Sequence, residues 1–78
     1  MESSTPVRLP DTLKTVKVDT VSASVTYVGV AAPGASAADA VWQIKKLSKT
    51  GTVLSVLWAD GNVEYDNVWD NRTGLTYL

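Results

Sequence analysis

The stretch VWQIKKLSKTGTVLSVLW, residues 41–58, decides the fold class of this chain. Its two ends, residues 41–44 and 53–58, are rich in β-branched and aromatic residues, which are enriched in strands. Residues 49–52, KTGT, form a short connection that contains a glycine, as the turn of a β-hairpin does. The stretch therefore predicts two antiparallel strands joined by a tight turn.

A helix over residues 36–48 is the alternative for part of this stretch. Ser36 has the side chain of a helix N-cap, Asp39 follows three residues later, and apolar residues recur near helical spacing after it. Gly51 is suited to end such a helix. Strand composition and the turn favour the hairpin, so we expect residues 36–40 to be a loop.

The chain before the hairpin is also strand-like. Residues 15–20 and 22–30 hold many β-branched and aromatic residues, and the proline and glycine in residues 32–36 end the second run. Within that run Val25 and Tyr27 point to one face, and the residues that alternate with them point to the other. Two further strands are expected here.

The chain after the hairpin begins with Asp60-Gly61-Asn62, a turn whose glycine can adopt a positive φ. We expect this turn to return the chain as a strand over residues 63–65. Residues 66–72, DNVWDNR, have poor strand propensity and many local side-chain acceptors, so they predict a tight or 3₁₀-like corner. A final strand over residues 75–78 follows.

These segments predict an all-β fold: a small antiparallel barrel or curled sheet of five to six short strands with an extended N-terminal arm. A flat sheet of this size would leave one apolar face exposed, which favours closure or curling. We place the β domain at residues 15–78 and the arm at residues 1–14, where Pro6 and Pro10 oppose regular structure. The expected core or rim aromatics are Trp42, Trp58, Trp69, Tyr65 and Tyr77.

Composition narrows the function. The 78 residues include no cysteine and no histidine, so disulfides, typical zinc sites and Ser-His-Asp or Cys-His catalysis are excluded, and we expect neither enzymatic activity nor a cofactor. A formal net charge of −1 without a basic run makes nucleic acid an unexpected partner, and no apolar stretch is long enough to span a membrane. A domain this small has a thin core, so we expect partner subunits to stabilise it.

Oxygen-bearing side chains recur at Asp60, Asn62, Glu64 and Asp66, which would share one face of an extended segment and suit a calcium ion. The spacing departs from the helix-loop-helix calcium loop, because glycine is second rather than sixth. A solvated strand face with turn-forming side chains is the interpretation we favour.

An interface with other subunits is the other candidate site. Its expected residues are the anchors Trp42, Trp58, Trp69 and Arg72 together with Val7 and Leu9 of the arm. Arg72 is expected to stack on Trp69 or to bridge to a carboxylate. The basic cluster Lys45, Lys46 and Lys49 is expected to discourage edge-to-edge aggregation, or else to contact an acidic partner.

Six short motifs follow one another over residues 27–78: YVG at 27–29, APG at 32–34, VWQI at 41–44, WADG at 58–61, YDNVWDNR at 65–72 and LTY at 75–77. Their order resembles that of small structural proteins and tail-protein modules of tailed bacteriophages. The resemblance implies a β-rich fold and a phage origin, and it carries over no catalytic residue. Residues 1–20 lie outside it.

The expected function is therefore that of a non-enzymatic virion structural protein, made in the host cytoplasm and present in many copies. It would contact other phage structural proteins and copies of itself, as a capsid decoration or fibre-attachment protein or as a tail or neck component. The alternatives are a host receptor- or glycan-binding module of a tail fibre, in which Trp58 and Trp69 would face solvent, and a small regulator made during infection.

Overall fold

The structure, a computed structural model, describes residues 13–78, so Val7, Leu9 and most of the predicted arm lie outside the described residues. Its elements in chain order are β1 (Thr15–Thr20), β2 (Val25–Ala31), β3 (Ala40–Thr50), β4 (Val53–Trp58), β5 (Asn67–Val68) and the 3₁₀ helix η1 (Trp69–Gly74). No helix within residues 13–78 is long and apolar enough to cross a membrane.

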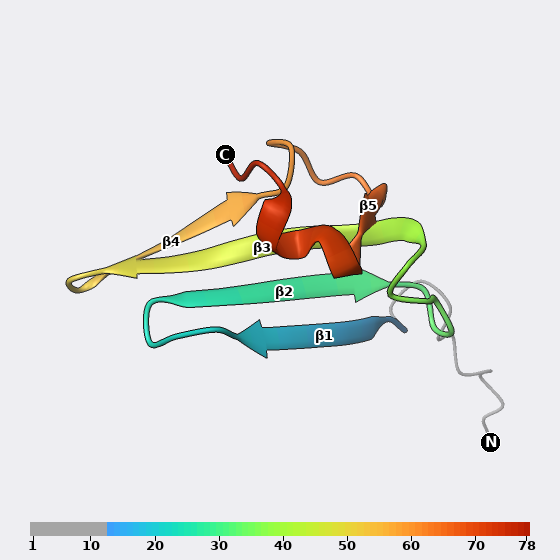
Figure 1. The fold of residues 1–78 in the computed structure, drawn as a ribbon, viewed down its shortest axis with the longest axis horizontal. Coiled ribbons are helices and arrows are strands. Elements are labelled where there is room, and N and C mark those ends of the chain that lie inside the picture. The colour runs from blue at the N-terminus through green and yellow to red at the C-terminus, as the bar shows by residue number, and fades with distance from the viewer. Residues whose placement is uncertain (1–12) are drawn as a thin grey trace, which may run out of the picture.

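The strands form one antiparallel sheet in the order β1-β2-β3-β4, and β5 pairs with β3 (Figure 1). The prediction of an all-β antiparallel fold is confirmed. The sheet is not closed into a barrel, because β1 and β4 lie at opposite ends of the strand order rather than beside each other.

Strand β3 organises the sheet. One edge pairs with β2, while the other pairs with β4 along residues 45–50 and with β5 near Ala40 and Trp42. The predicted hairpin around Gly51, whose φ is +61°, is confirmed, and the helix over residues 36–48 is excluded.

The apparent helix cap is used in a turn instead. The Ser36 N–H donates to Oδ2 of Asp39 at 3.3 Å, the Ser36 Oγ accepts from the Ala38 N–H at 3.2 Å, and the Asp39 N–H donates to the Ser36 carbonyl at 3.0 Å. These contacts form one turn, after which β3 begins at Ala40. Ser36 and Asp39 therefore stabilise a turn through local side-chain hydrogen bonds and do not cap a helix, as such residues do in many turns.

Two predicted strands near the C-terminus differ in the structure. Residues 63–65 form no strand, because the positive φ values of Asp60 and Gly61 turn the chain away from β4. The carbonyl of Val63 instead accepts a hydrogen bond from the Gln43 side chain at 2.9 Å.

The predicted final strand is reduced to a single bridge, Ala59 with Tyr77. Around it Trp58 and Leu78 exchange backbone hydrogen bonds of 2.9 and 3.0 Å, and the Asp60 N–H donates to the Thr76 carbonyl at 2.8 Å. The C-terminal residues thus pair with the end of β4, in the place where sequence reasoning put residues 63–65. The corner predicted over residues 66–72 is confirmed in part: η1 spans Trp69–Gly74, while Asn67 and Val68 form the short strand β5 instead.

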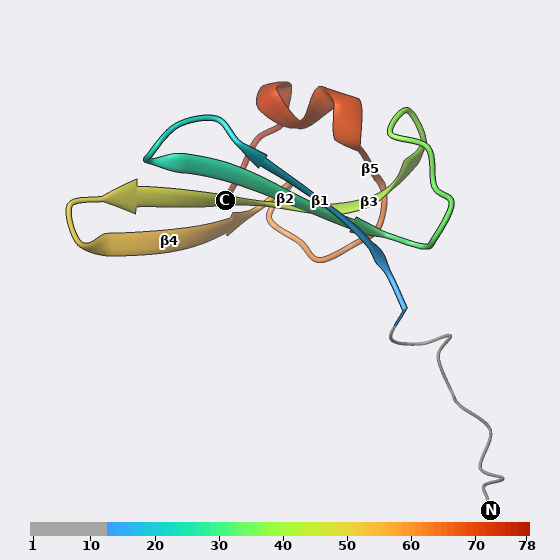
Figure 2. The ribbon, with the colours of Figure 1, turned by 90° about the horizontal axis from the view of Figure 1, so that it is seen from below.

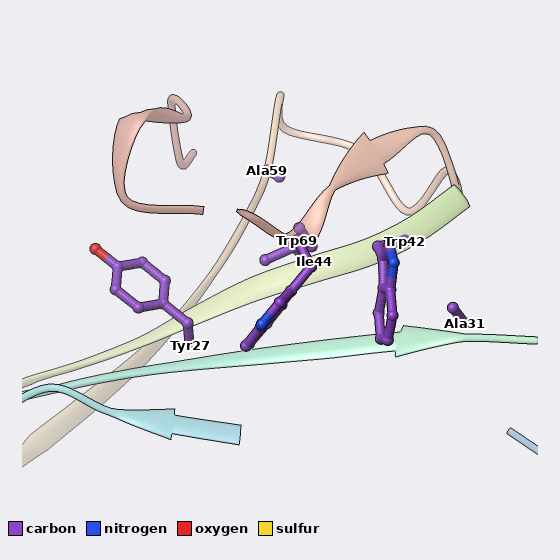
Figure 3. Close-up of a cluster of buried hydrophobic side chains, with 6 residues drawn as sticks. All are labelled: Tyr27, Ala31, Trp42, Ile44, Ala59 and Trp69. Carbon is purple, nitrogen blue, oxygen red and sulfur yellow. The ribbon is translucent and has the colours of Figure 1, made fainter. Parts of the chain in front are cut away.

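One face of the sheet, the packed face, carries the core. Its buried side chains come from β2, β3, the β4 end and η1, and they are Tyr27, Ala31, Trp42, Ile44, Ala59 and Trp69 (Figure 3). The ring centroids of Trp42 and Trp69 are 5.9 Å apart at an interplanar angle of 40°. Gly29 lies under these two rings, and only a residue without Cβ leaves room for them.

The opposite face, the open face, is not covered by a second layer. Figure 2 shows η1 on one side of the sheet, while the connection between β4 and β5 runs on the other side. That connection crosses one end of the open face, where the Gln43 side chain donates to the Val63 carbonyl and the Lys14 ammonium lies 4.9 Å from the Tyr65 ring. The remaining side chains of the open face are Val16, Val18, Thr20, Thr26, Val28, Val30, Lys45, Leu47, Lys49, Leu54, Val56 and Trp58.

Candidate functional site

The open face follows from the strand register. Across the sheet, Val18 pairs with Val28, Val28 with Lys45, and Lys45 with Trp58. A second row joins Thr20, Thr26, Leu47 and Val56. Because residues directly opposite one another in an antiparallel pair point to the same side, each row is a band of side chains on one face.

Several of these apolar side chains are well exposed. The exposed fraction is 61% for Val18, 57% for Leu54 and 47% for Val56. Four strands spaced by about 4.8 Å and about six residues long cover roughly 400 Å². The apolar side chains within this footprint form a patch of up to a few hundred Å², and patches of that size often mark interaction surfaces.

The charged side chains that the strands place on the open face are positive. Lys45 and Lys49 lie on it, and the strands place no carboxylate there within residues 13–78. The Lys45 ammonium stands 5.3 Å from the centroid of the Trp58 ring, so the charge and the apolar surface form one continuous feature. An apolar surface with an acidic rim would complement the open face.

The predicted edge-protecting role of the basic cluster is wrong. Lys45, Lys46 and Lys49 all lie on β3, where Lys45 and Lys46 are paired on both sides and Lys49 pairs with β4 and donates its N–H to the Ser24 carbonyl at 2.8 Å. Lys46 points to the packed face, where its ammonium lies 5.9 Å from the Tyr77 ring. Because alternate residues face opposite sides, consecutive lysines cannot form a single basic patch in a strand.

Arg72 joins three parts of the packed face. Its Nε donates to Oδ2 of Asp19 in β1 at 2.9 Å, and its guanidinium carbon lies 4.7 Å from the Trp69 ring centroid. Its carbonyl accepts a 2.7 Å hydrogen bond from the Tyr77 hydroxyl. The two predicted roles, stacking on Trp69 and bridging to a carboxylate, are both present.

The predicted interface anchors separate into two groups. Trp42 and Trp69 are 0% and 6% exposed and belong to the core of the chain itself, and Arg72 holds η1 on the sheet. Trp58 is half-buried and lies on the open face, so it remains the tryptophan that a partner can contact. The sequence located the aromatic residues and did not reveal which of them would be used internally.

A second apolar face was expected to be buried by closure or curling of the sheet, so the exposure of the open face was not predicted. Val16 and Val18, Val28 and Val30, and Leu54 and Val56 each repeat an apolar residue at spacing two, on the side opposite the core residues. Strands that are apolar on both faces indicate two buried faces. Only one is buried within residues 13–78.

The oxygen-bearing residues of the predicted cation site are not gathered by the fold. Asn62 Oδ1 accepts the Glu64 N–H at 2.9 Å, and Asp66 Oδ1 accepts from the Asn67 side chain at 3.2 Å. Asp60 adopts a φ of +60° at the turn. Over residues 13–78 no three acidic, histidine or cysteine side chains converge on one point, so the structure offers no support for a cation site.

Most aromatic rings of the chain already have a cation over them. Lys45 lies over Trp58 and Arg72 lies over Trp69, as described above. In addition, the Lys14 ammonium lies 4.9 Å from the Tyr65 ring and the Lys17 ammonium lies 5.9 Å from the Trp42 ring. A sugar-binding platform needs rings free to stack. The geometry therefore does not favour the glycan-binding alternative.

The Tyr77 hydroxyl gives a test of the packed face. Burial raises the pKa of Tyr77 to about 12 from 10.0, with Tyr27 and Asp60 adding to the shift and Arg72 opposing it. The unfolded chain ionises this phenol near pH 10 and the folded chain only near pH 12, so its contribution to stability is complete below pH 10 and is lost as pH rises to 12.

We expect the free energy of unfolding to fall more steeply between pH 10 and 12 in the parent chain than in Tyr77→Phe. At pH 8 the variant should be less stable by about 1 kcal/mol, because the hydrogen bond to the Arg72 carbonyl is lost. Urea unfolding at several pH values would measure both curves. Parallel curves would show that Tyr77 ionises alike in the folded and unfolded chains.

No protein-family model, curated protein or solved structure matches this chain.

Proposed function

We propose that this chain is a non-enzymatic structural protein of a tailed-bacteriophage particle, in which the open face packs against neighbouring subunits. The open face is the observation that carries the proposal: it is a single-layer sheet surface with exposed valine and leucine side chains. The resemblance of residues 27–78 to phage structural proteins supplies the setting.

The energetics favour a role in assembly. Covering roughly 400 Å² of mainly apolar surface is worth roughly 10 kcal/mol before the cost of association is subtracted. Contacts of this size are individually modest, and they become stable when many copies are held in a symmetric array. Our first choice of location is the capsid surface or its vertices, and a tail, baseplate or neck position is the second.

Mass spectrometry of purified particles of the encoding phage tests the proposal. The copy number should be measured against the major capsid protein in the same sample. Tens to hundreds of copies would support a capsid or tail-tube location, and a few copies would support a tail-tip or fibre location. Absence of the protein from the particles would refute the structural role and favour the regulator.

A pair of variants on one strand tests whether the open face is the contact. We expect Leu54→Lys with Val56→Lys to reduce incorporation into particles at least about 10-fold, because two desolvated lysines would oppose burial of the open face. The matched control is Val53→Lys, an equally exposed valine on the other face of β4. Equal incorporation of both proteins would show that this face is not the contact.

A further inference from the structure

Strand β1 is the outermost strand of the sheet. Within residues 13–78 no strand pairs with its outer edge (Figure 1). The Val21 N–H donates to the Val25 carbonyl at 3.0 Å, so in this ladder the odd-numbered residues direct their backbone groups to β2. The N–H and carbonyl groups of Val16, Val18 and Thr20 are therefore directed outward, and a free edge of this kind is a template for another strand.

The side chains of β1 are arranged symmetrically about Val18. Lys17 and Asp19 flank it on the packed face, while Val16 and Thr20 follow at equal distances on the open face. An antiparallel strand that meets a copy of itself at Val18 therefore places opposite charges against each other. The sequence TVKVDT is self-complementary in this sense.

We infer that β1 pairs antiparallel with β1 of a second copy, about a twofold axis that passes through Val18. In this register Val18 lies opposite the partner's Val18, Lys17 opposite the partner's Asp19, and Val16 opposite the partner's Thr20. The outward backbone groups then form about six hydrogen bonds between the copies. Two Lys–Asp pairs form on the packed face, at positions where side chains across an antiparallel ladder approach closely.

Charge selects this register over its neighbours. A shift by one residue would put side chains on the wrong faces. A shift by two residues places Lys17 opposite a second Lys17 in one direction, and Asp19 opposite a second Asp19 in the other. Like charges directly opposite each other destabilise a ladder, so the register centred on Val18 is the one that β1 specifies.

The contacts within one copy are compatible with this pairing. Asp19 uses Oδ2 for Arg72, which leaves Oδ1 for the lysine of the second copy. The Lys17 ammonium lies over the Trp42 ring at 5.9 Å, the far limit of such a contact, so it can turn toward the edge at little cost. A chain of Arg72, Asp19 and the partner's Lys17 would then cross the interface.

Pairing through β1 joins the two sheets into one. The open faces become continuous, and the exposed Val16 and Val18 of both copies lie at the centre of the combined surface. The inference deepens the proposed function by naming a second copy of the chain as the partner at the β1 edge. It rests on the proposed function only in placing this dimer within a larger assembly.

Single cysteines test the register, because the chain has none of its own. In Val18→Cys the two cysteines would lie directly opposite, with Cα atoms about 5.5 Å apart, within disulfide range. Val16→Cys or Thr20→Cys alone would place its cysteines about 13 Å apart, four residues along the ladder. We expect mild oxidation to cross-link the purified Val18→Cys protein to itself. The Val16→Cys and Thr20→Cys proteins should not cross-link when each is oxidised by itself, but they should cross-link to each other when the two are mixed.

Val53→Cys is the control for random collision, since residue 53 is as exposed as residue 18 and lies on β4. Cross-linking of Val18→Cys no faster than that of Val53→Cys would overturn the inference. Cross-linking of Val16→Cys or Thr20→Cys alone, at the rate expected for Val18→Cys, would overturn the register.

A charge variant tests the pairs without cysteine. In a Lys17→Glu dimer each of the two Lys–Asp pairs is replaced by a Glu–Asp pair of like charge. We therefore expect the dimer dissociation constant, measured by analytical ultracentrifugation, to rise about 10-fold or more. Lys17→Arg keeps the charge and should dimerise as the parent does. Circular dichroism would verify that both variants are folded, and equal dissociation constants would overturn the Lys–Asp pairing.

The outcomes also separate this inference from the proposed function. Presence of the protein in particles without cross-linking of Val18→Cys would refute only the β1 contact. Cross-linking of the purified protein together with its absence from particles would refute only the virion role.

Discussion

Replacing Trp42 with alanine is expected to unfold most of the protein at 25 °C. Trp42 is fully buried, packs against Trp69 and donates its indole N–H to the Ser36 carbonyl at 2.9 Å. Removing a buried tryptophan costs about 3–5 kcal/mol, and the orphaned carbonyl adds to this. The core of a domain this small rarely supplies more than about 3–5 kcal/mol, so little stability would remain.

Urea unfolding followed by circular dichroism measures the effect, and Trp58→Ala is the matched control. Trp58 is the same residue type and is half-buried on the open face, so its loss should cost roughly half as much. A smaller variant, Trp42→Phe, keeps part of the ring and should fall between the parent and Trp42→Ala. Equal losses for Trp42→Ala and Trp58→Ala would contradict the assignment of the core to the packed face.

Gly29→Ala is expected to destabilise the fold by about 3 kcal/mol, although alanine ordinarily improves a strand by removing a flexible residue. A Cβ at residue 29 would lie 2.6 Å from Cζ3 of Trp69 and 3.1 Å from Cε3 of Trp42. Rings that are packed on both sides cannot move away without opening the core. Urea unfolding measures the change in the free energy of unfolding. A loss of stability would show that the Trp69 ring of η1 packs directly against residue 29 of β2.

Gly74→Ala is the control for this substitution, because a Cβ there meets no atom within 4 Å. Its stability should stay within about 0.5 kcal/mol of the parent. A double-mutant cycle sharpens the test: in a Trp69→Leu background, Gly29→Ala should lose most of its cost, since the clashing ring is gone. Additive effects would mean that Gly29 acts through its backbone and not through Trp69.

Much of the sheet was accessible from local sequence. The hairpin at Gly51 and the strands on either side of it follow from propensity and turn chemistry and were predicted, and the corner predicted over residues 66–72 overlaps the 3₁₀ helix at residues 69–74. The alternation in β2, with Val25 and Tyr27 on one face, was also predicted correctly, but the burial of Tyr27 in the core was not predicted. Local rules worked wherever a segment pairs with its neighbour in sequence.

The remaining features depend on contacts between distant segments. Residues 63–65 have strand-like composition, yet the place beside β4 is taken by residues near Tyr77. Trp69 is a core residue because Gly29, forty positions earlier, leaves space for its ring. The exposure of the open face was not predicted for the same reason, since the number of layers over a sheet is a property of the whole fold and not of any one strand.

Because η1 follows β1 to β4 along the chain, synthesis makes the sheet before the helix that covers it. β1 to β4 emerge first and can pair through short hairpins, which form rapidly. Trp69 and Tyr77 arrive later, so for a period of seconds at ordinary translation rates both sides of the nascent sheet are apolar and uncovered. Chaperone capture, or docking onto a finished copy, would be most useful in that interval, before the last dozen residues close one side.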